Sequence, residues 1–581
     1  MSKLKFRSDI TALRGVAIIS VILFHINPEI FPGGFLGVDI FLVISGYLIS
    51  LSVSKEIERG RFSIKEFFKR RVMRLFPVLY LVLFVTSIFA WSWMLPNALE
   101  NYGQSIIATI FLGNNILLYL TSGYWDLASE YKPLLHTWSL GLEEQFYILF
   151  ALVMKYISPN RSGFLSFTFF GSLILYTAAN SLDFFSENFI FYLIPTRIWQ
   201  FLLGYIVAKK LEFKGNNTRA ILLQYSFIVL ILFVTLKYSK DFAALYTLLV
   251  CSLTALLLAH KNLNVSRLYS NRIIQDVGLK SYSLYLWHFP IFALLRVYSK
   301  TIPSTLDYIY LMPLVWVLAH FSYVFIEMRF TGKTQNRFIY SLLGIGLILA
   351  VFGFSLHINN GYSNRVFEDE IAATRSDHTF KIIDHRVYDK LEYTDLAKSH
   401  VLITGDSYSA DLIYILDPLI DTNKIELAHA TWLPKDIGLE EMSIFKNSDI
   451  IIFAQDEVYK EVNVKRVFST LFGKKIMFLG TKHFGDNLNW LSRESQSNRR
   501  NCWQLPNKEY FEIDIESKSV IPSENYISLF DIACDKAGRI KITNDKGELL
   551  SSDRKHLTQA GVEYWRELFI ENNLEIKILH D

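Results

Sequence analysis

Arg14 and His25 lie within one apolar segment, ALRGVAIISVILFH. Both side chains are ionisable, so they could take part in chemistry within that segment. They are eleven residues apart. On a helix with a rise of about 1.5 Å per residue, this spacing puts them on roughly one face, about 16 Å apart along the axis. A cation in a membrane-spanning helix costs at least about 2.5–3.5 kcal/mol, so both residues are functional candidates. Alternatively, Arg14 extends to the membrane surface and His25 lies in the outer interface.

Glu143 and Glu144 lie in a second apolar segment, TWSLGLEEQFY. Adjacent carboxylates at that depth need a partner or a proton. In one interpretation, one of them polarises or orients His25. In the other, one of them packs structurally against Arg197 or His288.

Three arginines, Arg70, Arg71 and Arg74, precede the third apolar segment in KRRVMRLFP. Guanidinium groups match phosphate oxygens in a bidentate manner, which suits a phosphate-binding role. The alternative is a plain topological signal, since cytoplasmic loops carry excess Lys and Arg.

A separate constellation lies in the C-terminal part of the chain. Ser407 of the sequence GDS follows an apolar strand and opens a helix, and Asp553 and His556 precede another helix in DRKHLTQAG. The spacing suits a nucleophile, Ser407, a base, His556, and an orienting carboxylate, Asp553. Alternatively, Ser407 only caps its helix. Gln455, after IIIFA, is the candidate oxyanion donor beside the Ser407 N–H.

The elements that must carry these residues divide the chain into two parts. Of its 581 residues, 51% are hydrophobic, and the mean hydropathy is +0.26, which excludes an ordinary soluble enzyme. Apolar runs stop near Ile358, and about 20 such residues span a membrane. We predict about eleven spans, near residues 10–28, 35–53, 75–95, 138–157, 163–180, 189–208, 219–236, 241–260, 281–298, 305–327 and 338–357.

Basic clusters set the expected orientation. They fall on one side of the membrane only if the run 101–120 does not cross, so we expect this run to be re-entrant or interfacial. The N-terminus is then cytoplasmic and the C-terminal part lies outside. Residues 359–398 read as a linker or extension. From about residue 399 onward, a short apolar strand at the start of HVLITGDSYSADLIYIL and strands at 447–455 and 474–481 alternate with helical patterns, which predicts a parallel α/β sheet.

The sequence contains no CxxC pair, metal-ligand cluster or glycine-rich phosphate loop, and we expect neither a metal nor a nucleic-acid partner. Cys251 lies in an apolar run and suits packing. Cys502 and Cys534 are compatible with a disulfide in an oxidising compartment, but the sequence does not decide this.

Over about residues 8–330 the chain resembles the acyltransferase family 3 membrane enzymes. The resemblance rests on Arg14, His25 and the motifs GGFLGVDIFLVISGYLI, RRVMRLFP, LLHTWSLGLEEQFY, RIWQFLLG and SYSLYLWHFPI. It implies that His25 is essential, that Arg14 lies nearby, and that Arg71 and Arg74 bind the acyl donor, acetyl-CoA. The C-terminal motifs resemble the SGNH hydrolase fold, although Gln455 stands where that fold usually has asparagine.

The resemblance implies four segments: a membrane domain over 1–330, an additional helix over 331–358, the linker, and a periplasmic SGNH-like domain over 399–581. It also implies a bacterial inner-membrane O-acetyltransferase that modifies a surface polysaccharide, with lipopolysaccharide O-antigen as the leading acceptor. Peptidoglycan or another exopolysaccharide is an alternative acceptor. A transporter fused to an acetyl esterase is a different class of alternative, since ionisable residues within spans suit transport equally.

Overall fold

The structure is a computed structural model. It describes residues 7–121, 129–157, 161–182, 185–210, 217–260, 269–330, 336–366, 392–431, 443–455, 464–551 and 553–579. Two compact units divide the chain. Unit 1 comprises residues 1–91, 99–297 and 303–358, and unit 2 comprises 92–98, 298–302 and 359–581. Most of the predicted linker, 359–398, lies outside the described residues.

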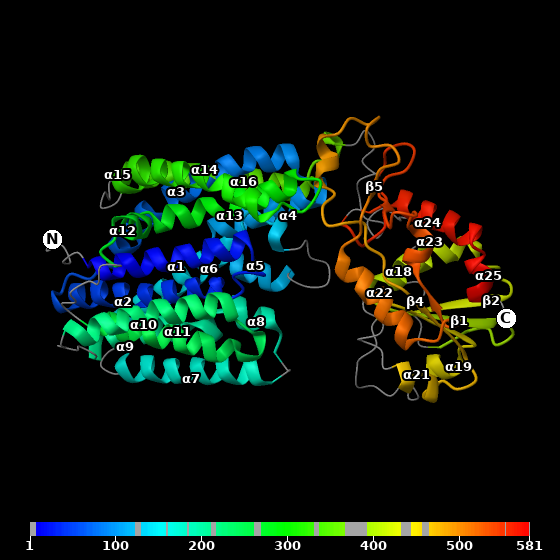
Figure 1. The fold of residues 1–581 in the computed structure, drawn as a ribbon, viewed down its shortest axis with the longest axis horizontal. Coiled ribbons are helices and arrows are strands. Elements are labelled where there is room, and N and C mark those ends of the chain that lie inside the picture. Colours follow the sequence, from blue (N-terminus) through cyan, green and yellow to red (C-terminus); the bar gives the residue numbers. More distant parts are fainter. Residues whose placement is uncertain are drawn as a thin grey trace. The chain divides into compact units, whose positions relative to one another are not determined.

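Unit 1 is helical, and helices occupy each of the eleven predicted spans (Figure 1). These are α1 (Ser8–Ile26), α2 (Gly37–Glu58), α3 (Ile64–Trp93), α6 (Trp138–Tyr156), α7 (Arg161–Ser181), α9 (Ile194–Lys210), α10 (Asn217–Lys237), α11 (Ala243–Ala259), α13 (Ser281–Tyr298), α14 (Thr305–Ser322) and α16 (Asn336–Ile358). Within the described residues, eight helices are long and apolar enough to cross a membrane. The exact number of crossings stays a prediction.

The run 101–120 is not one continuous helix. It is divided between α4 (Pro96–Ile110) and α5 (Asn114–Thr121). Leu112 has a φ of 59°, a left-handed backbone that interrupts helical hydrogen bonding, and Gly113 follows it. Neither piece reaches the length of about 20 residues that a span requires. This agrees with the expectation that the run does not cross. The remaining helices of unit 1 are α8 (Glu187–Tyr192), α12 (Arg272–Leu279) and α15 (Met328–Phe330).

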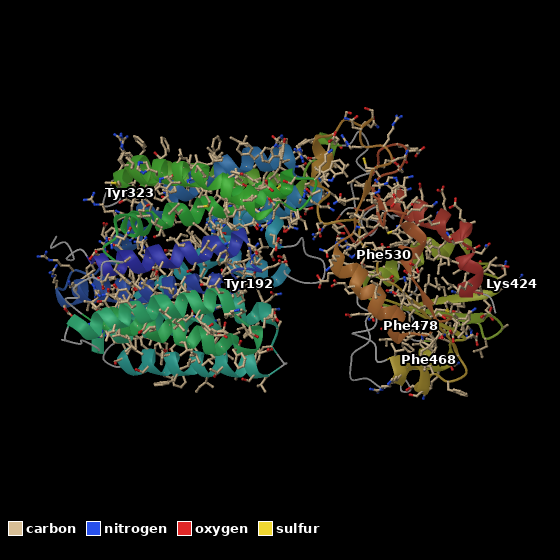
Figure 2. All side chains as sticks on the ribbon, in the orientation of Figure 1. Tyr192, Tyr323, Lys424, Phe468, Phe478 and Phe530 are labelled. Carbon is tan, nitrogen blue, oxygen red and sulfur yellow. The ribbon has the colours of Figure 1, made fainter. Side chains whose placement is uncertain are left out.

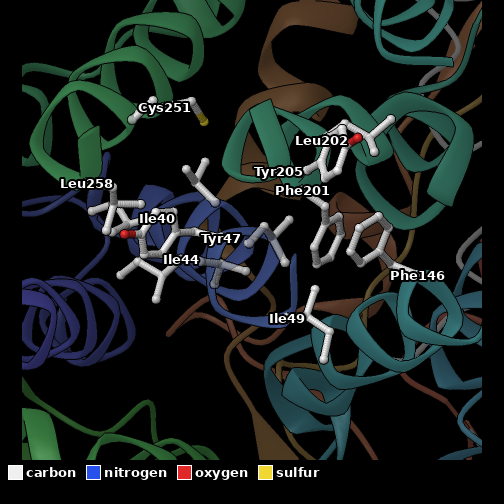
Figure 3. Packing of buried hydrophobic residues seen from close by; sticks show 14 of the residues in the cluster. Ile40, Ile44, Tyr47, Ile49, Phe146, Phe201, Leu202, Tyr205, Cys251 and Leu258 are labelled. Atoms are coloured by element: carbon white, nitrogen blue, oxygen red, sulfur yellow. The ribbon is translucent and has the colours of Figure 1, made fainter. Parts of the chain in front are cut away.

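Glycine allows α2 and α9 to approach closely. A Cβ atom at Gly46 would collide with the carbonyl oxygen of Phe201, and one at Gly204 would collide with that of Val43. Small residues of this kind let membrane helices pack by van der Waals contact. Beside this contact, the ring of Phe201 stacks on Phe146 of α6 at 4.4 Å between centroids (Figure 3). The packing fixes α6, which carries Glu143 and Glu144, against the N-terminal helices.

Unit 2 contains a five-stranded parallel sheet in the order β2-β1-β3-β4-β6. The strands are β1 (Ser399–Gly405), β2 (Ile425–Thr431), β3 (Ile450–Ala454), β4 (Lys475–Leu479) and β6 (Tyr526–Ile527). Its helices are α18 (Ser407–Leu416), α19 (Ser443–Asn447), α21 (Val464–Thr470), α22 (Lys508–Val520), α23 (Leu529–Ala533), α24 (Gln559–Glu571) and α25 (Leu574–Leu579). This confirms the predicted α/β class.

Strand β3, IIIFA, is continuously apolar, because a parallel sheet is covered on both faces. All five residues of β3 are buried. Phe478 of β4 packs against Phe468 of α21, with ring centroids 5.9 Å apart, and Figure 2 labels both side chains. A small antiparallel pair, β5 (Trp503–Gln504) and β7 (Ile540–Lys541), lies outside this sheet. Cys502 and Cys534 are both free, so the structure contains no disulfide between them.

Two short segments, 92–98 and 298–302, belong to unit 2 through their hydrogen bonds. The Leu95 N–H donates to Asn489 Oδ1 at 2.8 Å. The Asn487 side-chain amide donates to the carbonyl oxygen of Ser299 at 2.6 Å. Both asparagines lie in the loop that follows β4.

Candidate active sites

Unit 1 contains a cavity of about 370 Å³ whose wall is rich in cations and hydroxyl groups. Arg14, Arg70, Arg71 and Arg74 line it, with Glu143 as the carboxylate, together with Ser45, Ser139, Tyr147, Tyr282 and Tyr285. The structure therefore brings Arg14 together with the arginines of the RRVMR motif, whereas His25 does not line this cavity. Such a wall favours an anionic ligand.

The arginines differ in their partners. Arg71 forms a bidentate ion pair with Glu144, with N–O distances of 2.6 and 2.9 Å, and its guanidinium lies 3.6 Å from the centre of the Tyr147 ring. Arg70 pairs with Glu56 at 2.8 Å. Among the described residues, Arg14 and Arg74 make no hydrogen bond or ion pair. Unpaired cations in a partly buried wall are unfavourable until an anion fills the cavity.

The two adjacent glutamates do not contact His25, so the structure does not support the interpretation in which one of them orients it. Glu144 is bound to Arg71, and Glu143 accepts hydrogen bonds from Ser45 and from the hydroxyl of Tyr147. Glu143 therefore presents its carboxylate to the cavity instead. The alternative pairing with Arg197 does not occur either, because Arg197 pairs with Asp39 of α2 at 2.8 Å.

Ser45 and Tyr147 were not identified from the sequence. Tyr147 stands four residues after Glu143, which places both on one face of α6, so its spacing carried a usable signal. Ser45 lies on another helix and has no such local signal.

His25 lies in the last turn of α1 and does not line the cavity. Its Nδ1 is 2.9 Å from the carbonyl oxygen of Val21. Because a carbonyl oxygen only accepts, Nδ1 carries the proton and Nε2 keeps a lone pair. The ring contacts Phe289 and His288, with centroids 4.8 and 5.2 Å away. This tautomer is the one that a general base needs.

In unit 2 the candidate nucleophile occupies a tight turn. Ser407 is the first residue of α18 and follows Gly405, whose φ of 145° and whose contact with β3 exclude a side chain. The N-cap of α18 is Asp406, whose carboxylate accepts the Tyr408 N–H at 2.8 Å. The interpretation of Ser407 as a mere cap is therefore wrong. The side chain of Ser407 is outside the described residues, so its backbone alone fixes its place.

Asp553 and His556 are hydrogen-bonded as the motif predicts. His556 Nδ1–H donates to Asp553 Oδ2 at 2.6 Å, and the His556 backbone N–H donates to Asp553 Oδ1 at 2.9 Å. This leaves the Nε2 of His556 as the base. Between them Arg554 has a φ of 86°, a strained conformation for a side chain of this size.

The ring of His556 lies beside the start of α18. Its centroid is 6.5 Å from that of Tyr408, the residue after Ser407, and the Leu557 N–H donates to Asp411 of the same helix at 3.3 Å. The fold therefore brings the Asp553–His556 pair to the start of α18, at the carboxyl end of β1, where ligands bind in open parallel sheets. That the pair acts together with Ser407 as a triad stays a prediction.

Gln455 lies next to this turn. It directly follows β3, and its Cγ would be 2.9 Å from a Cβ atom at Gly405. Its Oε1 is buried without a hydrogen-bond partner among the described residues. The position suits the predicted role as an oxyanion donor, which remains a prediction.

A neutral histidine supports the loop of the Asp553–His556 pair. The Phe484 N–H donates to the Arg554 carbonyl oxygen at 2.8 Å, and the Nδ1 of the adjacent His483 accepts the N–H groups of Gly485 and Asn507. Burial, followed by the charges of Arg554 and Lys555, holds the pKa of His483 well below its usual value.

Acidification is therefore expected to destabilise the protein. Below about pH 6.5 the unfolded chain protonates His483 while the folded chain does not, so stability falls by up to about 1.4 kcal/mol per pH unit from this residue. Thermal unfolding of the purified chain at about pH 7.5 and about pH 5.5 measures the loss. In His483→Asn the amide oxygen still accepts the two N–H groups, and the acid-induced loss is expected to shrink. An equal loss in this variant would assign the effect to other groups.

The comparisons with known proteins agree with the sequence motifs. The profile of the acyltransferase domain family matches residues 7–326. A Staphylococcus aureus protein provisionally named an O-acetyltransferase is 31% identical over 357 residues, 56% of this chain and 58% of the relative. The S. aureus O-acetyltransferase OatA of strain MRSA252 is 29% identical over 387 residues, 59% of this chain and 62% of the relative. The matches thus span about three fifths of these relatives. No solved structure matches the chain significantly.

Proposed function

Because the chain belongs to the acyltransferase family, we propose that it is an O-acetyltransferase that moves an acetyl group from acetyl-CoA to a hydroxyl of a cell-surface glycan. The observation that carries this proposal is the cavity in unit 1, where Arg14 and Arg74 are unpaired and Arg71 is held rigidly by Glu144. Arginine forks of this kind suit the phosphate groups of the donor. The names of the matching relatives support O-acetyl transfer.

The two units would act in series. His25 takes the proton of the hydroxyl that receives the acetyl group in unit 1. Ser407, activated by His556 and Asp553, accepts the group directly or through a carrier and passes it to the glycan. Transfer in place of hydrolysis requires that the glycan exclude water from the second site.

The membrane is the bacterial inner membrane, with the N-terminus in the cytoplasm, unit 2 in the periplasm and lipopolysaccharide O-antigen as the acceptor. The one-sided distribution of basic residues supports this orientation. In a transporter fused to an esterase, neither the arginines without ion pairs nor the base-competent tautomer of His25 would have a purpose.

The donor site is tested with the full chain reconstituted in liposomes and supplied with radiolabelled acetyl-CoA and surface glycan. Arg74→Gln is expected to raise the KM for acetyl-CoA about tenfold, since one charge-assisted hydrogen bond to phosphate is lost. Arg337→Gln is the matched control, because Arg337 lies at the start of α16 and does not line the cavity. No label in the glycan with the wild type, or an unchanged KM in Arg74→Gln, contradicts the proposal.

A further inference from the structure

Three histidines from different parts of unit 1, His25 among them, form one cluster. His288 of α13 contacts His25 with ring centroids 5.2 Å apart, and His136 contacts His288 at 5.9 Å. His136 is 2% exposed and His288 is fully buried. We refer to His25, His136 and His288 as the histidine cluster.

The cluster holds ring nitrogens without partners. The Nδ1 of His288 lies 3.1 Å from the carbonyl oxygen of Leu284, so this nitrogen carries the proton and Nε2 keeps its lone pair. Among the described residues, His288 Nε2 and both nitrogens of His136 have no hydrogen-bond partner. An unsatisfied buried polar group costs about 1–3 kcal/mol, so several in one place call for a functional explanation.

His25 itself lacks the carboxylate that commonly stabilises a protonated base. Glu143 and Glu144 are engaged with Ser45, Tyr147 and Arg71. Its backbone carbonyl oxygen accepts from Arg296 at 3.4 Å, and Arg296 pairs with Glu130. A proton taken up by His25 is therefore better passed on than kept.

The cluster adjoins the wall of the arginine cavity. Tyr285 lines that cavity, its hydroxyl donates to the His136 carbonyl oxygen at 2.7 Å, and it lies 2.6 Å from the Ser139 hydroxyl. The Tyr285 ring contacts His136 and His288, with centroids 5.4 and 5.5 Å away. The histidines thus connect His25 with the wall of the proposed donor site.

We propose that His288 acts through His25: it takes over the proton that His25 removes from the acceptor hydroxyl. This rests on the proposed thioester donor. The hydroxyl O–H and the thioester C–S bonds break, and the acceptor oxygen bonds to the acetyl carbon. The proton passes from His25 to the neighbouring His288 ring and ends on the leaving thiolate. No net charge is created.

The test is His288→Asn in the reconstituted full chain. Asparagine retains an N–H near the position of Nδ1 for Leu284 but has no Nε2. We expect kcat for acetyl transfer to fall about 100-fold, the lower end of proton-transfer effects, with the KM for acetyl-CoA unchanged. The solvent deuterium isotope effect on kcat is expected to rise, since proton transfer becomes rate-limiting. His260→Asn is the matched control, because His260 makes the same bond to a carbonyl four residues earlier, outside the cluster.

The outcomes separate this inference from the proposed function. If His288→Asn keeps its kcat while His25→Asn is inactive, the proton transfer to His288 is wrong and the proposed function stands. If kcat falls with a wild-type isotope effect, His288 is only structural and the inference is overturned. If the wild type does not use acetyl-CoA, both the proton transfer to His288 and the proposed function are wrong.

Discussion

Cells that produce the His25→Asn variant are expected to lose O-acetyl groups from their surface glycan. Asparagine retains an N–H for the Val21 carbonyl but has no basic nitrogen where Nε2 stands. Removing a general base lowers the rate by about 10²–10⁴. Proton NMR of the isolated polysaccharide measures the acetyl signal at matched protein levels.

Ser407→Ala in the same cells shows whether the two units act on one path. If both variants lose the signal, they do. If only His25→Asn loses it, unit 1 acylates the glycan alone and unit 2 is accessory. An acetyl signal that persists in His25→Asn contradicts the role of His25 as the base.

The second large effect is expected at Asp553. Its carboxylate fixes the His556 tautomer by accepting from Nδ1, and an asparagine amide can turn its N–H toward that nitrogen and place the proton on Nε2 instead. Loss of the correct tautomer in a Ser-His-Asp triad lowers kcat by about 10⁴. Hydrolysis or transfer of an aryl acetate by the purified full chain measures the activity of unit 2 apart from the donor cavity.

Asp535→Asn serves as the control for Asp553→Asn. Asp535 likewise accepts from a neighbouring side chain, Arg539 at 2.7 Å, but it lies away from the Asp553–His556 pair in the same unit. The idea of a triad is contradicted if Asp553→Asn retains aryl-acetate activity, or if Ser407→Ala does.

The helices of unit 1 could be predicted because membrane spans follow hydropathy alone. The run 101–120 is the instructive exception. Its composition suits a span, and only the charges of distant loops argued against crossing. The physical cause, the left-handed backbone at Leu112, was not visible in the sequence, since leucine rarely adopts it.

The two sites differed in how much the sequence could reveal. Asp553 and His556 are three residues apart, so their hydrogen bond is local and their spacing predicted it. Ser45 and Arg71, the partners of Glu143 and Glu144 from other helices, lie on α2 and α3, and which helices lie beside α6 depends on packing that no local spacing encodes. For the same reason His288 was weighed as a partner for a glutamate, whereas the structure places it against His25.

The unpaired guanidiniums of Arg14 and Arg74 have a consequence for regulation. Under the proposed function they recognise the phosphates of the donor, which the reaction leaves unchanged. Spent coenzyme A would therefore compete with acetyl-CoA for the same cavity. The rate of acetylation at the cell surface would then follow the ratio of acetyl-CoA to free coenzyme A in the cell, and not the acetyl-CoA concentration alone. Surface modification would in this way report the carbon supply of the cytoplasm.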